Sequence, residues 1–129
     1  MKFDYVFDSY AWIEYFRGSE KGETVRRLLE ESRIATPTIV LAEISDSYGR
    51  ENHSFLEKDL SFITAKTAVI DLTADIAVLA GKVKNIVREK YKTNFGLADA
   101  IILQTARKCA AKVVTGDEHF KNIQNTVFL

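Results

Sequence analysis

Four acidic residues of this chain stand beside apolar residues, where a surface carboxylate is uncommon. Asp8 follows the run FDYVF, Glu43 lies in IVLAEI, Asp99 lies in GLADAII, and Asp117 follows KVVTG. Each has an ordinary explanation, because Asp accepts hydrogen bonds at helix starts and Glu can occupy the wet face of an amphipathic helix. Whether they act together depends on whether the fold brings them together.

Clustered carboxylates restrict the chemistry of a site. Like charges brought close together, and removed from water, disfavour ionisation, so a cluster needs a compensating cation. Carboxylate oxygens and waters suit Mg²⁺ or Mn²⁺, which also bind phosphate oxygens. A site of this kind supports phosphodiester hydrolysis, in which the metal activates water and stabilises the leaving oxygen.

Short apolar runs alternate with amphipathic segments along the chain. Strands are expected at 3–7, 34–35, 68–72, 112–115 and 126–129. Helices are expected at 9–18, 22–32, 37–49, 54–63, 74–91 and 97–110, with a helical turn at 117–123. Thr36 followed by Pro37 is typical of a helix start, with threonine at the N-cap.

This alternation predicts the fold class and the place of the site. Strands joined through helices pair in parallel by right-handed crossovers, so we expect a three-layer α/β/α sandwich with a short-stranded, mainly parallel sheet. At 129 residues, the chain is expected to form a single domain over 1–129. Ligands of such sheets gather at the carboxyl ends of the strands, where Asp8 and Asp117 are expected.

Composition excludes several other classes. The chain has 18 Lys and Arg and 18 Asp and Glu, so it lacks the overall positive charge of a nonspecific nucleic-acid binder. Cys109 is the only cysteine, which excludes an internal disulfide and a Cys-based zinc site and fits a cytoplasmic location. No apolar run suggests membrane insertion. His53 and His119 are expected on the surface, and the basic helix residues could line an RNA groove or simply be solvated.

The segments VFDSYAW, LAEI, LADAIILQTA and TGDEHF together resemble those of PIN-domain nucleases, particularly the VapC-type toxins of prokaryotic toxin-antitoxin pairs. The resemblance implies an endoribonuclease dependent on Mg²⁺ or Mn²⁺, an RNA substrate, a cognate antitoxin protein and a homodimer. It implies that the catalytic and metal-binding residues are Asp8, Glu43, Asp99 and Asp117, with hydroxyl support from Ser9 and Thr115. Tyr10 stands where many relatives carry a small residue.

Three alternatives to a PIN-domain nuclease are two other enzyme classes and an inactive PIN-fold module. Haloacid-dehalogenase phosphatases need a second Asp two residues after the first, and Tyr10 occupies that position. Phospho-receiver domains need a lysine near the end of the fifth strand, where this chain has Thr115, Gly116 and Asp117. A catalytically inactive PIN-fold module that binds a protein stays open, because a fold does not guarantee activity.

Overall fold

The computed structural model describes residues 2–129 and contains one sheet of five strands. Every neighbouring pair of strands is parallel, and the order across the sheet is β3-β2-β1-β4-β5. The strands are β1 (Tyr5–Phe7), β2 (Ile34–Pro37), β3 (Ala68–Ile70), β4 (Lys112–Thr115) and β5 (Thr126–Phe128). The expected short-stranded parallel sheet is confirmed.

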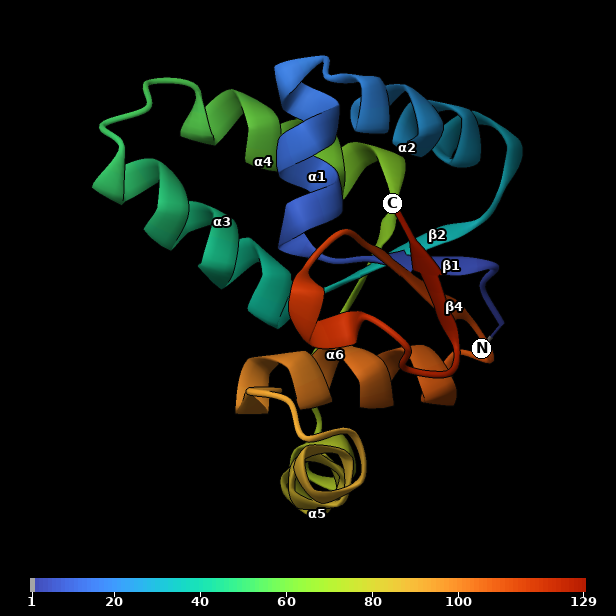
Figure 1. Cartoon of the computed structure of the whole chain (residues 1–129). Helices are drawn as coiled ribbons and strands as arrows, with labels where there is room; N and C mark the ends of the chain where they lie inside the picture. The colour runs from blue at the N-terminus through green and yellow to red at the C-terminus, as the bar shows by residue number, and fades with distance from the viewer. Residues whose placement is uncertain (1) are drawn as a thin grey trace.

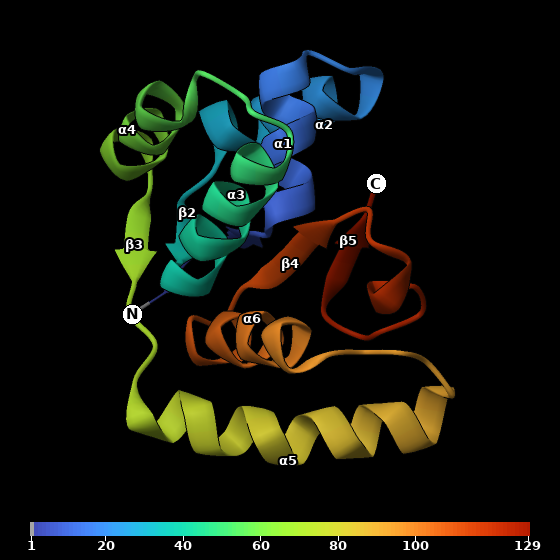
Figure 2. The same ribbon diagram turned by 90° about the vertical axis from the view of Figure 1, so that its left-hand side faces the viewer.

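Helices cover both faces of the sheet (Figures 1 and 2). One face carries α1 (Ser9–Arg17), α2 (Glu20–Glu31), α3 (Thr38–Arg50) and α4 (Leu56–Lys66). The other face carries α6 (Leu97–Lys108), and α5 (Ala74–Tyr91) packs on the outer side of α6, as Figure 2 shows. The three-layer sandwich is confirmed. None of the helices in residues 2–129 combines the length and apolarity needed to span a bilayer.

The hydrophobic core lies in the sheet and beneath the helices that cover its two faces. Strands buried on both faces read as continuous apolar runs, and Val6, Phe7, Val113 and Val114 are each fully buried. Trp12 of α1 is buried beside them, and its ring lies edge-on to Phe7 at a centroid distance of 5.2 Å. The central strands and α1 therefore form one packed unit, which supports the residues that follow β1 and β4.

The expected helix start at Thr36 was wrong. Thr36 and Pro37 belong to β2, and α3 begins at Thr38 with Pro37 as its N-cap. The Thr36 hydroxyl is engaged elsewhere, because Trp12 Nε1 donates to it over 3.2 Å and Thr67 Oγ1 lies 2.9 Å away. The φ of −65° at Pro37 suits an extended residue as well as a helical one.

The strand order places the ligand edge between β1 and β4. From the central β1 the chain first builds β2 and β3 on one side, and it later returns to build β4 and β5 on the other. The crevice outside such a reversal is where open α/β sheets bind ligands. Phe7 pairs with Val114, so Asp8 and Thr115 follow at the same edge. The expectation that Asp8 and Asp117 share this edge is confirmed.

Candidate active site

Asp8 is buried at the junction of β1 and α1. It is the N-cap of α1, and its Oδ1 accepts a 2.9 Å hydrogen bond from the backbone amide of Ala11. The pKa of Asp8 is raised to about 7, chiefly by burial and in smaller part by the charges of Glu43 and Asp117, while Thr115 and the Ala11 amide act in the opposite direction. The helix-cap explanation is correct, but the cap also faces two other acids.

Hydroxyl groups stand beside these acids. The fully buried Thr115 accepts a 3.0 Å hydrogen bond from the backbone amide of Asp117, and its hydroxyl also lies near Asp8. Ser9, the first residue of α1, similarly lies near Glu43. Each hydroxyl lowers the pKa of the carboxyl group that it lies near. Thr115 thus links the ends of β1 and β4.

Glu43 reaches the same edge from within α3. Burial raises its pKa to about 6, with further contributions from the charges of Asp99 and Asp117. Its Oε1 is buried and has no hydrogen-bond partner within residues 2–129. A buried carboxylate oxygen without a partner is costly, and it needs a reason beyond helix amphipathicity.

Asp99 and Asp117 combine a capping contact with a place in the cluster. Asp99, in the first turn of α6, accepts a 2.8 Å hydrogen bond from the Gly96 amide. Asp117 caps the short turn η1 (Glu118–Phe120) by accepting from the His119 amide over 2.9 Å. Both acids contribute to the raised pKa of Glu43. The four sequence-predicted acids therefore lie near enough to one another for their charges to act on Asp8 and Glu43.

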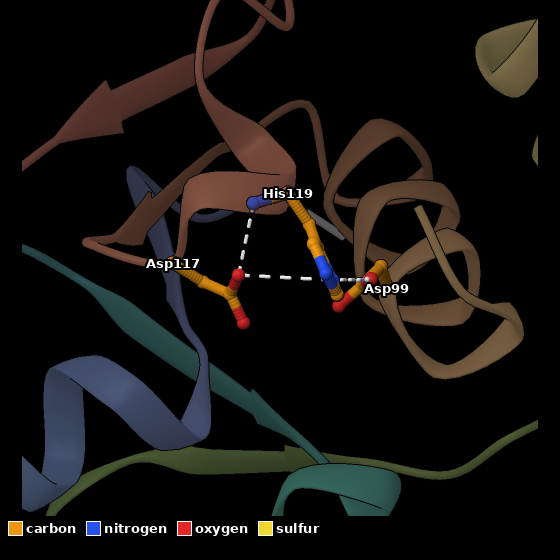
Figure 3. Close-up of side chains that lie close together, drawn as sticks. All are labelled: Asp99, Asp117 and His119. Carbon is orange, nitrogen blue, oxygen red and sulfur yellow. Dashed lines mark hydrogen bonds and ion pairs between the residues drawn. The ribbon is translucent and has the colours of Figure 1, made fainter. Parts of the chain in front are cut away.

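His119 is a residue whose role the sequence analysis missed. Its side chain is 42% exposed, yet Nδ1 lies 2.9 Å from Asp99 Oδ2 and 3.7 Å from Asp117 Oδ1 (Figure 3). Ligand atoms of Asp99, Asp117 and His119 all fall within 4.8 Å of one another. His119 is partly exposed at the surface, as expected, but its contacts with Asp99 and Asp117 were not predicted from the sequence. A histidine two positions after a strand-end acid was the available signal.

Comparison with known proteins defines the family. A model of the PIN domain matches residues 5–125. The chain belongs to the PIN domain family. No curated protein matches its sequence.

Solved structures share the fold of this PIN domain. A toxin-antitoxin complex from Klebsiella pneumoniae is 24% identical, with 96% of each chain covered and a TM-score of 0.72. VapBC2 from Rickettsia felis, bound to a DNA fragment from its promoter, is 20% identical over 97% of this chain and 96% of that chain, with a TM-score of 0.73. VapC20 from Mycobacterium tuberculosis, a toxin that cleaves the sarcin-ricin loop, is 20% identical over 94% and 95%, with a TM-score of 0.75.

Tyr10 forms one wall beside the acids of this PIN domain. A Cβ atom at position 116 would lie 2.3 Å from Tyr10 Cε1, so only glycine allows this ring to pack so closely on the segment between Thr115 and Asp117. The Tyr10 hydroxyl accepts a 3.0 Å hydrogen bond from Lys21 Nζ. An aromatic ring therefore packs directly against the backbone between Thr115 and Asp117.

Some of the other charged residues lie outside the cluster and form pairs on the surface. Asp46, one turn after Glu43 on α3, is exposed and contacts Arg50 rather than the pocket. Arg26 contacts Glu23 and Glu30, also on an exposed helix face. These pairs favour the interpretation that the basic helix residues form ordinary solvated faces.

The donor set of the site suits a divalent cation. Four carboxylates, two of them with pKa values raised by burial, place negative charge where water is limited. The buried, unpartnered Glu43 Oε1 is a group that a cation would satisfy. Oxygen-rich sites of this kind favour Mg²⁺ or Mn²⁺.

Proposed function

We propose that this PIN domain is a divalent-metal-dependent endoribonuclease and the toxin of a toxin-antitoxin pair. The observation that carries the proposal is the buried Glu43 Oε1, which has no hydrogen-bond partner among residues 2–129 and lies near three further carboxylates. The metal ligands and catalytic residues would be Asp8, Glu43, Asp99 and Asp117, and the ion Mg²⁺ or Mn²⁺. We expect the protein to act in the cytoplasm.

Residues beside the four acids would position them for phosphodiester hydrolysis. Thr115 holds the backbone of Asp117 and lies beside Asp8, and Ser9 lies beside Glu43. The bound ion would supply activation of water and stabilisation of the leaving oxygen. Asp8, Ser9, Thr115 and Asp117 lie on strand ends and helix starts and Glu43 lies within a helix, so the pocket is built before substrate arrives, as electrostatic catalysis requires.

RNA is the proposed substrate. VapC20, which has this fold, is a toxin that cleaves the sarcin-ricin loop, and the metal-oxygen chemistry inferred for the site is that of phosphodiester hydrolysis. With a net charge of zero, the protein would hold RNA through local contacts rather than through overall attraction. Lys21, held beside Tyr10 at one wall of the site, is a local cation of this kind.

A groove supports the proposal of an antitoxin partner. It lies between α1, α3 and α4, has a volume of about 770 Å³, and is lined largely by aromatic and aliphatic side chains, including Ile13, Tyr15, Phe16, Phe55 and Phe62. The structures from Klebsiella pneumoniae and Rickettsia felis are toxin-antitoxin assemblies. An amphipathic antitoxin helix would place its apolar face in such a groove. A basic antitoxin side chain reaching the acids would replace the cation's charge and inhibit the enzyme.

The first prediction tests the nuclease directly. Purified protein, free of any partner, is incubated with fluorescently labelled single-stranded RNA in Mg²⁺, in Mn²⁺, and in excess EDTA. We expect cleavage only with the metals, and we expect Glu43→Gln to reduce it by at least about 100-fold, as removal of key electrostatic groups does. Asp46→Asn, on the same helix but paired with Arg50, should cleave like wild type.

Two results would contradict the proposal in different ways. Undiminished cleavage in EDTA would show that the metal mechanism is wrong. Metal binding without cleavage of any tested RNA would instead favour the inactive protein-binding module, which shares the fold but not the reaction.

A further inference from the structure

His119 is held over the acidic cluster by a short, anchored turn. It lies in η1, next to Phe120, which is buried and packs edge-on against Phe95 at a centroid distance of 5.2 Å. The turn is also tied to β4, because Asp117 accepts the His119 backbone amide hydrogen over 2.9 Å. The imidazole is therefore directed at Asp99 by packing and hydrogen bonds together (Figure 3).

The contacts of Asp99 are divided unequally between its two oxygens. Oδ2 receives the Gly96 amide at 2.8 Å and lies 2.9 Å from His119 Nδ1. Within residues 2–129, these hydrogen bonds both fall on Oδ2, so Oδ1 is the oxygen left for another ligand. Since carboxylates that bind metals are themselves oriented by hydrogen bonds, this arrangement is that of a prepared ligand.

His119 also joins the two acids that come from opposite sides of the site. Its side chain contacts Asp99 on α6, and its backbone contacts Asp117 after β4. Two neighbouring carboxylates repel each other, and a donor placed against both reduces this cost. The imidazole reaches Asp99 across 20 positions of sequence, so the contact depends on the fold rather than on local geometry.

We propose that His119 is a positioning residue, which donates from Nδ1 to Asp99 Oδ2 and so presents Asp99 Oδ1 to the divalent cation. The proposal rests on the proposed metal site. The alternative role for this imidazole, direct metal coordination through nitrogen, would favour transition metals over Mg²⁺, because imidazole is a poor ligand for Mg²⁺. A donor role instead requires Mg²⁺ and Mn²⁺ affinity to change together.

The test measures metal binding without RNA. Isothermal titration calorimetry with Mg²⁺ and with Mn²⁺ is carried out on the full chain, as wild type, His119→Ala, His119→Asn and Glu118→Gln. Asn is the conservative variant, because its amide nitrogen is bonded to Cγ as Nδ1 is in histidine. Glu118→Gln is the matched control, since Glu118 is an exposed neighbour on the same turn.

We expect His119→Ala to lower the affinity for both Mg²⁺ and Mn²⁺ by about 10-fold to 100-fold, which is the usual effect of losing a group that orients a metal ligand. His119→Asn should recover most of the affinity, and Glu118→Gln should bind like wild type. Cleavage by His119→Ala should fall through kcat, with KM for RNA little changed. Melting in EDTA separates these effects from a loss of folding.

Three results would overturn the inference. Unchanged affinity in His119→Ala would mean that the contact with Asp99 is incidental. Loss of Mn²⁺ binding with Mg²⁺ binding intact, and no recovery in His119→Asn, would identify a nitrogen ligand instead. If wild type binds neither cation, the proposed metal site itself is wrong, and the role of His119 is wrong with it.

Discussion

At the scale of single residues, capping and site chemistry coincide. Asp8, Asp99 and Asp117 each accept a backbone hydrogen bond at the start of a helix or turn, and each also faces the other acids. In a parallel sheet, strand ends lead into helix starts, whose free amides and dipoles favour negative charge. Backbone amides thus stabilise the three aspartates at positions where they could also bind a metal. Glu43, which lies within α3, is not at a helix start.

The raised pKa of Asp8 makes the stability of the metal-free protein depend on pH. Burial raises this pKa from 3.8 to about 7, so between these values the folded state holds a proton that the unfolded chain releases. Stability is therefore lost as pH rises through this range, and Glu43, with its pKa raised to about 6, adds to the loss in the same direction. Bound metal should reverse the loss, since metal binding requires deprotonated ligands.

The measurement is thermal unfolding in EDTA across this range. We expect the Tm of wild type to fall by at least about 4 °C between about pH 5 and pH 7.5, roughly 1 kcal/mol for a domain of this size. Asp8→Asn should flatten the profile, because asparagine caps a helix well and carries no charge. Asp46→Asn should keep the wild-type slope. Equal slopes in Asp8→Asn and wild type would contradict the assignment.

At the scale of elements, the crossing of α1 and α2 depends on Gly22. A Cβ atom there would lie 2.1 Å from the backbone oxygen of Glu14, and backbone atoms cannot move aside as a flexible side chain can. The α1 helix begins directly at the site, with Asp8 as its N-cap and Ser9 as its first residue. The packing of two helices therefore sets where these two residues lie.

Gly22→Ala should accordingly destabilise the protein, even though alanine is the better helix former. The helices must separate, and overpacking of this kind costs about 1 to 3 kcal/mol. Denaturant unfolding measures the loss, and calorimetry should show weaker Mn²⁺ binding because α1 shifts. Gly49→Ala is the control, since nothing lies within 4 Å of a Cβ there. A Gly22→Ala protein as stable as Gly49→Ala would contradict this account.

At the scale of the whole molecule, α5 has an inner and an outer face. Its inner residues, including Ile76 and Ala80, are buried, and the helix packs on α6 rather than on the sheet (Figure 2). Its outer residues include Val78, Leu79 and Ile86, which are 61%, 43% and 64% exposed. Leu79 and Ile86 are seven positions apart and lie near one face of the helix. Apolar residues gathered on a surface indicate an interaction site.

We propose that the chain forms the homodimer implied by its family resemblance and that this face of α5 is buried in it, since symmetric pairs are the commonest oligomers. Ile86→Glu would place a charge in that interface, so the dimer should dissociate. Size-exclusion chromatography with light scattering gives the mass, which for one chain is 14.6 kDa. Glu89→Gln, on the same helix, should remain dimeric. Ile86→Glu eluting as a dimer would place the interface elsewhere.

Three features could be predicted from the sequence alone: the layers, the parallel sheet, and the presence of Asp8 and Asp117 at one edge of that sheet. These features follow from local patterns, namely apolar periodicity and the regular alternation of strand and helix, which each segment carries independently of its neighbours. Apolar neighbours made Glu43 and Asp99 candidates, and the family resemblance assigned them to the site, because no local pattern says that residues within two helices meet at a strand end.

Contacts between groups that are far apart in the sequence could be seen only in the tertiary structure. The contact of His119 with Asp99, the packing of Tyr10 on Gly116, and the use of the Thr36 hydroxyl by Trp12 each join segments far apart in the chain. Local patterns therefore predict a surface position for His119 and a helix cap at Thr36, and they do not predict the contacts that these two residues make. Such contacts depend on strand order and on how helices cross, and neither is encoded in the spacing of residues within one segment.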